Sequence, residues 1–151
     1  NNVTGPTSPY CHTEKPQTQF KLLGSYTIPR IALQVSSTLQ SIPGPEIAAT
    51  YTATTAQIQP SLGRPLSGGA ANVSVNLVQP GKMYGERLNQ LDFRFARPVR
   101  FNGKRAQFSL DLYNALNVDT VLTVNNAFAT WLRPQSVMLA RFAKLSMQLD
   151  F

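Results

Sequence analysis

The clearest alternation of hydrophobic and polar positions lies near the end of the chain, at residues 141–151. Alternate positions there carry Ala143, Leu145, Met147, Leu149 and Phe151, and the positions between them carry Lys144, Ser146, Gln148 and Asp150. Only Arg141 and Phe142, at the start, depart from the pattern. Successive side chains of a β-strand point to opposite faces of the sheet, so this segment predicts a strand with one apolar and one polar face.

Residues 88–97 and 107–116 show the same alternation and predict a hairpin. Between them lie Asn102 and Gly103. An Asn-Gly pair favours the positive backbone angles of a two-residue type I′ turn. A second hairpin is predicted at 20–39, where alternation stops at Pro29 and Arg30 and resumes from Ile31.

Two long stretches carry weaker signals. Within 41–87, residues 42–45 (IPGP) predict a rigid turn, 47–55 and 72–78 are compatible with strands, and 63–69 and 80–85 are compatible with loops. Residues 117–139 are long and irregular. A loop of that length in a compact domain is usually functional, or else indicates that elements have been missed.

Composition agrees with a β-rich chain. Charged residues make up 14% of the 151 residues, below the ~25% typical of soluble domains, and polar uncharged residues replace them, which disfavours both disorder and a helical bundle. The net charge of +7 would by itself suggest a nucleic-acid or anionic-membrane partner. Cys11 is the only cysteine and His12 the only histidine. We therefore expect no internal disulfide, no metal and no cofactor.

No run of 18 apolar residues is present, so no transmembrane helix is expected. The chain starts at Asn1 and shows no basic-then-apolar signal peptide, which fits a fragment or a processed product. The predicted strands are close to the ~9–11 residues of a membrane-spanning strand and longer than the ~5–6 common in soluble domains. Together with the alternating short and long connections, this pattern predicts an all-β antiparallel meander, a partial outer-membrane β-barrel of about five to seven strands.

Four stretches carry a more specific resemblance: 87–95 (RLNQLDFRF), 108–117 (FSLDLYNALN), 131–134 (WLRP) and 140–151 (ARFAKLSMQLDF). They resemble the C-terminal strands of TonB-dependent outer-membrane receptors, in particular the Oar-like branch with an N-terminal carboxypeptidase-regulatory-like domain. Shorter matches at 11–12, 26–29, 41–45 and 63–69 extend the resemblance over nearly the whole chain.

The resemblance implies a gated transporter of the bacterial outer membrane, in which a plug closes a barrel of about 22 strands and a nutrient is imported. This chain lacks the plug and most of the barrel, so we do not expect it to transport alone. Its partners would be outer-membrane lipid and the remaining strands and plug of the parent receptor, with further copies of itself as an alternative source of strands. Leu149 and Phe151 resemble the terminal signal that the barrel-assembly machinery reads by strand addition.

In the orientation of that family, the turns at Asn102-Gly103 and Pro29-Arg30 are periplasmic and the two long stretches face outside. Candidate ligand contacts are Trp131, Arg133, Asn125 and Asn126, because aromatic and amide side chains suit carbohydrate or peptide ligands.

Three alternatives remain open. The apolar positions would also fit the core of a soluble β-rich binding or assembly protein. A nucleic-acid patch would use Arg94, Arg97, Arg100, Lys104 and Arg105, but the simpler interpretation is a solvated turn, and we expect no nucleic-acid partner. An enzyme is not expected, because the chain has no Gly-x-Ser-x-Gly elbow and no phosphate-binding loop. Asp92 and Asp111 could face each other across the predicted hairpin as a carboxylate pair, but Arg94 would be equally near. The simpler interpretation of these side chains is a polar barrel wall.

Overall fold

The computed structural model describes residues 17–150, so the predictions for Cys11, His12 and Phe151 lie outside the described residues. The chain divides into two compact units, which are treated separately. We call Gln17–Gly44, Glu86–Thr120 and Val137–Phe151 the sheet unit, and Pro45–Gly85 with Val121–Ser136 the loop unit.

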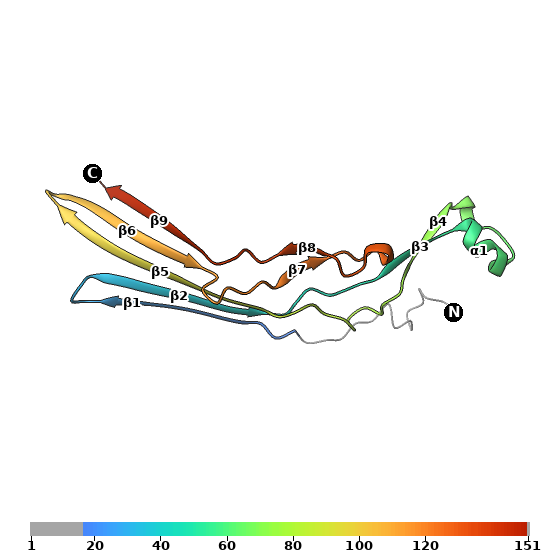
Figure 1. Cartoon of the computed structure of the whole chain (residues 1–151), viewed down its shortest axis with the longest axis horizontal. Coiled ribbons are helices and arrows are strands. Elements are labelled where there is room, and N and C mark those ends of the chain that lie inside the picture. Colours follow the sequence, from blue (N-terminus) through green and yellow to red (C-terminus); the bar gives the residue numbers. More distant parts are fainter. Residues whose placement is uncertain (1–16, 151) are drawn as a thin grey trace. The chain divides into compact units, whose positions relative to one another are not determined.

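The sheet unit is a five-stranded antiparallel meander (Figure 1). Its strands, in spatial order, are β1 (Phe20–Ile28), β2 (Leu33–Ile42), β5 (Leu88–Phe101), β6 (Lys104–Tyr113) and β9 (Phe142–Asp150). Each pairs antiparallel with its neighbours. The predicted antiparallel β architecture is confirmed, and no closed barrel is found among the described residues.

The predicted hairpin at Asn102 and Gly103 is confirmed. Phe101 pairs with Lys104 across the two residues, whose φ angles are 50° and 80°. Both angles are positive, as a type I′ turn requires. The β1–β2 turn is longer than predicted, because Ile28 pairs with Leu33 and leaves Ile31 exposed in the turn.

Strand β5 runs past the predicted end at residue 97 and includes Pro98. Its pairing with β2 ends at Ala96, so Pro98 lies where β5 has a partner on the β6 side alone. Proline lacks an N–H to donate and is tolerated in such edge positions. Strand β6 ends at Tyr113, three residues before the predicted boundary at residue 116.

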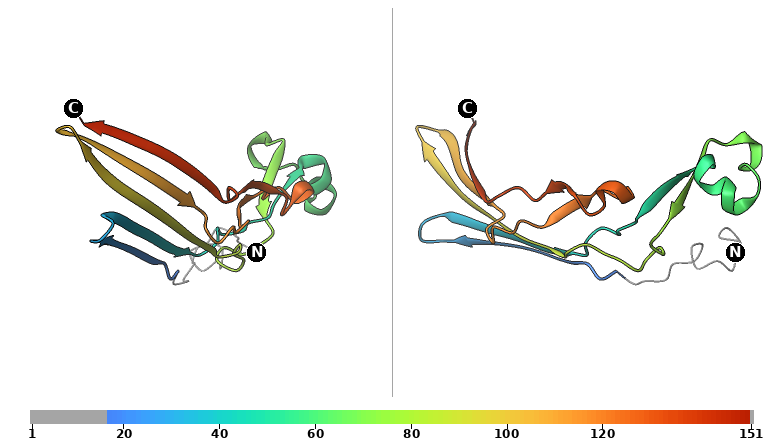
Figure 2. Two further views of the ribbon diagram at one scale, coloured as in Figure 1. Left: turned by 60° about the vertical axis from the view of Figure 1, so that its left-hand side comes forward. Right: turned by 45° about the vertical axis from the view of Figure 1, so that its right-hand side comes forward.

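The loop unit contains two small antiparallel sheets (Figure 2). Strands β3 (Thr50–Thr54) and β4 (Asn72–Asn76) form one and fall within the two segments predicted at 47–55 and 72–78. Strands β7 (Val121–Val124) and β8 (Pro134–Val137) form the other. The prediction that 117–139 is irregular was therefore wrong in part, because four-residue strands are too short to show a clear period.

Helix α1 (Thr55–Leu62) was not predicted, and it is followed by a short 3₁₀ helix η1 (Ser67–Gly69) inside the expected loop. The helix has a recognisable start and end. The Thr54 hydroxyl accepts from the Gln57 N–H while the Gln57 side chain accepts from the Thr54 N–H, which is a capping box, and Gly63 ends the helix at φ 70°. The side chains of Ile47, Ala49 and Ala53 are buried in this unit.

Candidate functional site

The strand register separates the side chains of the sheet unit into a mostly apolar face and a mostly polar one, with Leu23 and Phe142 as exposed hydrophobic exceptions on the latter. Phe95 pairs with Val35 on one side and with Leu110 on the other, and Leu110 pairs with Leu145. Paired residues in a sheet point to the same face. We call this the apolar face. It carries Phe20, Leu22, Tyr26, Ile28, Leu33, Val35, Leu39, Leu91, Phe93, Phe95, Val99, Phe101, Phe108, Leu110, Leu112, Leu145, Met147 and Leu149.

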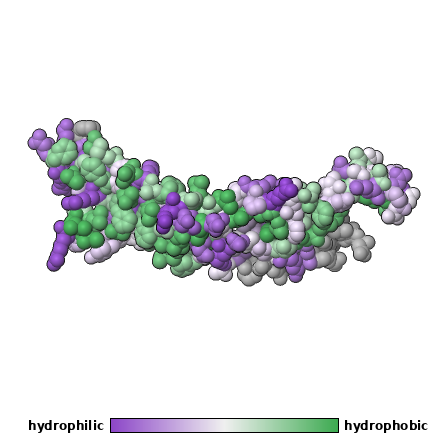
Figure 3. Space-filling model, viewed as in Figure 1, coloured by the Kyte–Doolittle hydropathy of each residue, from purple (hydrophilic) through white to green (hydrophobic). Residues whose placement is uncertain are grey.

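The apolar face is uncovered by the described residues of the sheet unit. Leu145 is 82% exposed and Tyr26 is 68% exposed, and among the described residues of this unit the buried hydrophobic ones are Ala96 and Ala106. Figure 3 shows hydrophobic side chains at the surface over these strands. A continuous apolar surface of this kind marks contact with another apolar phase or molecule.

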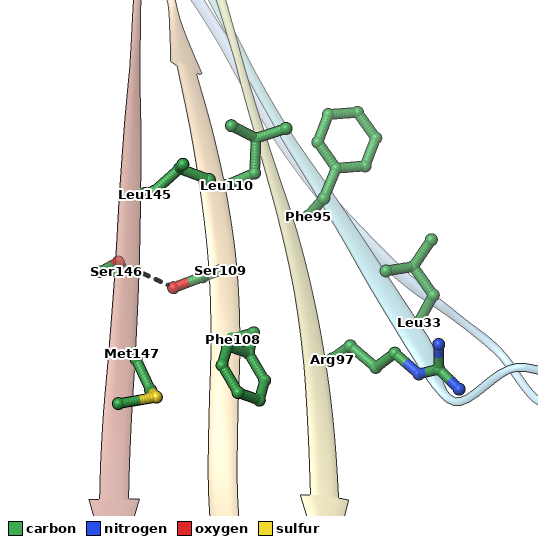
Figure 4. A pocket seen from close by; sticks show the side chains of 9 residues that line it. All are labelled: Leu33, Phe95, Arg97, Phe108, Ser109, Leu110, Leu145, Ser146 and Met147. Carbon is green, nitrogen blue, oxygen red and sulfur yellow. Dashed lines mark hydrogen bonds between the residues drawn. The ribbon is translucent and has the colours of Figure 1, made fainter.

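A shallow hollow lies on the apolar face over four strands (Figure 4). From the apolar face it is lined by Leu33 of β2, Phe95 and Arg97 of β5, Phe108 and Leu110 of β6, and Leu145 and Met147 of β9. Ser109 and Ser146, which the register assigns to the opposite face, also border it. Arg97 extends from β5 toward Leu33, as the close view shows. Its guanidinium is the only charged group of this lining.

The opposite face, which we call the polar face, carries hydrogen bonds from strand to strand. The Ser25 and Ser36 hydroxyls lie 3.0 Å apart, the Gln40 amide donates to Gln90 at 2.7 Å, and the Ser109 and Ser146 hydroxyls lie 2.9 Å apart. The carboxylates Asp92 and Asp111 do not form a pair with each other. Asp111 faces Arg94, whose Nε lies 3.6 Å from Oδ1, while Asp92 accepts from the Gln90 side chain and the Asn114 N–H.

Two asparagines that were not singled out in the sequence hold the end of the sheet where β6 stops and β9 starts. Asn114 is 1% exposed; its amide donates to the Val118 and Leu139 carbonyls at 2.8 Å each and accepts from the Val118 N–H. Asn117 accepts from the Arg141 N–H at 3.0 Å. Both have positive φ. Asparagine directly after an alternating strand is a signal for such a turn.

The four predicted ligand contacts lie together in the loop unit, around the turn between β7 and β8. The Trp131 indole N–H donates to the Ala48 carbonyl at 3.0 Å, and the Asn125 side chain accepts from the Ala127 N–H. These two side chains therefore have structural partners. Asn126 and Arg133 are exposed, and the Asn126 carbonyl accepts from the Thr50 N–H.

The turn between β5 and β6 carries the basic residues considered as a nucleic-acid patch. Arg94 lies on the polar face, where it forms an ion pair with Asp111. The register places Arg97 and Lys104 on the apolar face and Arg105 on the polar face. Leu149, from the predicted assembly signal, pairs with Ala106 on the apolar face.

No cluster of three or more residues suited to a metal ion occurs within residues 17–150. Over the same part of the chain, no helix has the length and hydrophobicity needed to cross a membrane. Comparison with family models, with curated proteins and with solved structures found no match to this chain.

Proposed function

We propose that this chain is a C-terminal barrel segment of a TonB-dependent outer-membrane receptor, whose parent imports a nutrient ligand. The five-stranded sheet would be one part of the barrel wall, with its apolar face toward outer-membrane lipid and its polar face toward the lumen. The segment would not transport a ligand alone, and the proposed role involves neither catalysis nor a cofactor.

The separation of the two faces is the observation that carries this proposal. A soluble sheet buries its apolar face against a second layer, whereas a barrel strand presents apolar side chains outward and polar ones inward. Here Leu145, Leu110 and Phe95 share the exposed face, and Ser146, Ser109 and Arg94 share the hydrogen-bonded one. That arrangement fits a membrane phase on one side and water on the other.

The strands also have suitable lengths. They run from 9 residues in β1 and β9 to 14 in β5, and a spanning strand needs ~9–11. In a bilayer every backbone N–H and C=O must be paired, so an open sheet has to close with further strands. The smallest outer-membrane barrels have about eight, so the proposal requires strands from the parent receptor or from further copies, placed by the barrel-assembly machinery.

The proposed ligand contacts are on the long connections, which in the receptor family face the outside. Trp131, Arg133, Asn125 and Asn126 gather at one turn and combine an aromatic ring, a cation and two amides. Such side chains suit a carbohydrate or peptide ligand.

The test is the particle mass of the 151-residue chain, measured by size-exclusion chromatography with light scattering, with and without detergent. We expect a species that needs detergent or forms a ring-like oligomer. A detergent-free monomer would overturn the proposal and favour the alternative, a soluble β-rich binding or assembly protein derived from such a segment.

A further inference from the structure

We propose that the hairpin end of the sheet unit binds an anionic glycerophospholipid, with Arg97 contacting the phosphate and the hollow beside it holding an acyl chain. This inference rests on the proposed function, because it requires the apolar face to lie against lipid. It adds a particular lipid chemistry and a particular position on that face.

The first argument is the charge at this end of the sheet. We define the basic rim as the arginines of the two hairpins beyond the β2–β5 pairing: Arg30, Arg97, Arg100 and Arg105. Among the described residues of the same strand ends, the only carboxylate is Asp150, which pairs in register with Arg105. The rim is therefore strongly positive, and such a rim attracts an anionic lipid surface.

The second argument is the position of Arg97. It pairs with Phe108, which pairs with Met147, so its side chain belongs to the apolar face and not to the polar one. Arg97 is exposed, and no carboxylate or hydrogen-bond acceptor of the described residues contacts its guanidinium. Arg94, three residues earlier on the polar face, has Asp111 and Ser109 as partners. With the apolar face against lipid, as proposed, an acceptor for this guanidinium would come from outside the sheet.

The third argument is depth along the strands. Arg97 lies one residue beyond Ala96, the last β5 residue paired with β2, and Ile28 pairs with Leu33 at the adjacent turn. This is the level at which two of the five strands end, although the apolar face of β5 continues through Val99 and Phe101, so Arg97 lies near the end of the apolar span. A cation at the end of an apolar span extends toward the headgroups, because a guanidinium in hydrocarbon costs several kcal/mol.

A phosphate suits this site because a guanidinium can bind two phosphate oxygens at once. The neighbouring floor of the hollow is apolar, with Phe95, Phe108, Leu110, Leu145 and Met147. A glycerophospholipid presents a phosphate and an acyl chain within one molecule and would use both parts. Duplex DNA presents phosphates alone and would leave the hollow empty.

The experiment measures how the full chain partitions into vesicles. The chain is diluted from urea into vesicles of phosphatidylcholine, with or without phosphatidylglycerol, and the bound fraction is measured by flotation. We expect tighter partition into vesicles that contain phosphatidylglycerol. Arg97→Gln should lower that partition coefficient by about fivefold, the effect of one basic residue near an anionic surface, and leave partition into phosphatidylcholine unchanged.

Two control variants separate charge from geometry. Arg64→Gln removes the same charge from the loop unit, where Arg64 donates to Ser67 at 3.4 Å, and should leave both partition coefficients unchanged. Arg97→Lys keeps the charge but loses the two-pronged contact, so its partition should lie between those of the parent chain and Arg97→Gln.

Each other outcome identifies what has failed. Equal partition of the parent chain into both vesicles, or equal effects of Arg97→Gln and Arg64→Gln, overturns the lipid site and leaves the proposed function intact. Failure to bind either vesicle contradicts the proposed function itself. Binding to duplex DNA that Arg97→Gln weakens by the same factor would replace the lipid with a nucleic acid.

Discussion

Asp111 of β6 lies directly opposite Arg94 of β5, with 3.6 Å between the Arg94 Nε and the Asp111 Oδ1 atoms. The Asp111 side chain is 7% exposed, whereas that of Arg94 is 52% exposed. Because the arginine is half solvated, the pair itself contributes little, but removing it would leave a buried carboxylate with its main partner missing.

We therefore expect Arg94→Ala to lower the free energy of unfolding by about 1 kcal/mol, the lower end of the cost of an unsatisfied buried polar group, because Lys144 lies opposite Asp111 on β9 and keeps a cation near the carboxylate. Arg100→Ala is the matched control, because Arg100 lies opposite Arg105 and its removal relieves a like-charge pair. Urea unfolding of the refolded chain in detergent measures both. Equal urea midpoints for the two variants would show that Arg94 does not stabilise the buried Asp111 carboxylate.

The second prediction concerns Asn114. Asn114→Ala removes three side-chain hydrogen bonds at a position with φ 51°. We expect a loss of about 3 kcal/mol, roughly 1 kcal/mol for each of the three part-buried hydrogen bonds, because backbone groups of Val118 and Leu139 lose their partners. Asn117→Ala removes one such bond at φ 54° and should cost less than half as much. Similar losses would mean that backbone strain, and not hydrogen bonding, dominates at both positions.

The third prediction concerns the β5–β6 turn. Gly103 has φ 80° and nothing lies within 4 Å of the position of an added Cβ. Gly103→Val should therefore destabilise through the backbone alone, by about 1–2 kcal/mol. Gly24→Ala, in β1 with equal space and no positive φ, should be neutral or slightly stabilising. Thermal unfolding followed by circular dichroism compares the two, and a destabilised Gly24→Ala would contradict this account.

The fourth prediction distinguishes a lipid-facing sheet from a water-facing one. Leu145 is 82% exposed, so Leu145→Arg in a soluble protein should be neutral or improve solubility. On the lipid side of a barrel strand it should cost about 2–4 kcal/mol near the bilayer midplane.

Gln148→Arg, three residues later on the polar face, is the matched control and should have little effect. The yield of folded chain in lipid vesicles measures both substitutions. An unimpaired Leu145→Arg variant would argue against a lipid-facing surface.

The fifth prediction concerns the loop unit. In the proposed parent receptor, Trp131→Ala should weaken ligand uptake. Trp131→Phe keeps an aromatic ring but loses the indole N–H that donates to Ala48. If the ring contacts the ligand, uptake should fall more in the alanine variant than in the phenylalanine variant. Unchanged uptake in both would remove Trp131 from the ligand contacts.

Part of the site was predictable because it is encoded at period two. The alternation through residues 88–97 and 142–150 assigned Phe95, Leu145 and Ser146 to faces, and the register confirms those assignments. The strand ends were less accurate, since Ile31 continues the alternation in sequence but lies in the turn. Helix α1 was missed although Thr54, Gln57 and Gly63 carry its start and end signals, because its eight residues hold too little periodic pattern.

The sequence by itself determined the long strands of the sheet unit to within a few residues at their ends, which of their side chains share a face, and where Asn102 and Gly103 reverse the chain. These depend on contacts between near neighbours and on the backbone angles that each residue tolerates. Only the tertiary structure decided that β2 pairs with β5 across the first long connection and β6 with β9 across the second. It also placed Met147 of β9 beside Phe108 of β6 and closed the Asn114 hydrogen bond to Leu139. Such contacts join residues distant in sequence, so no local pattern specifies them.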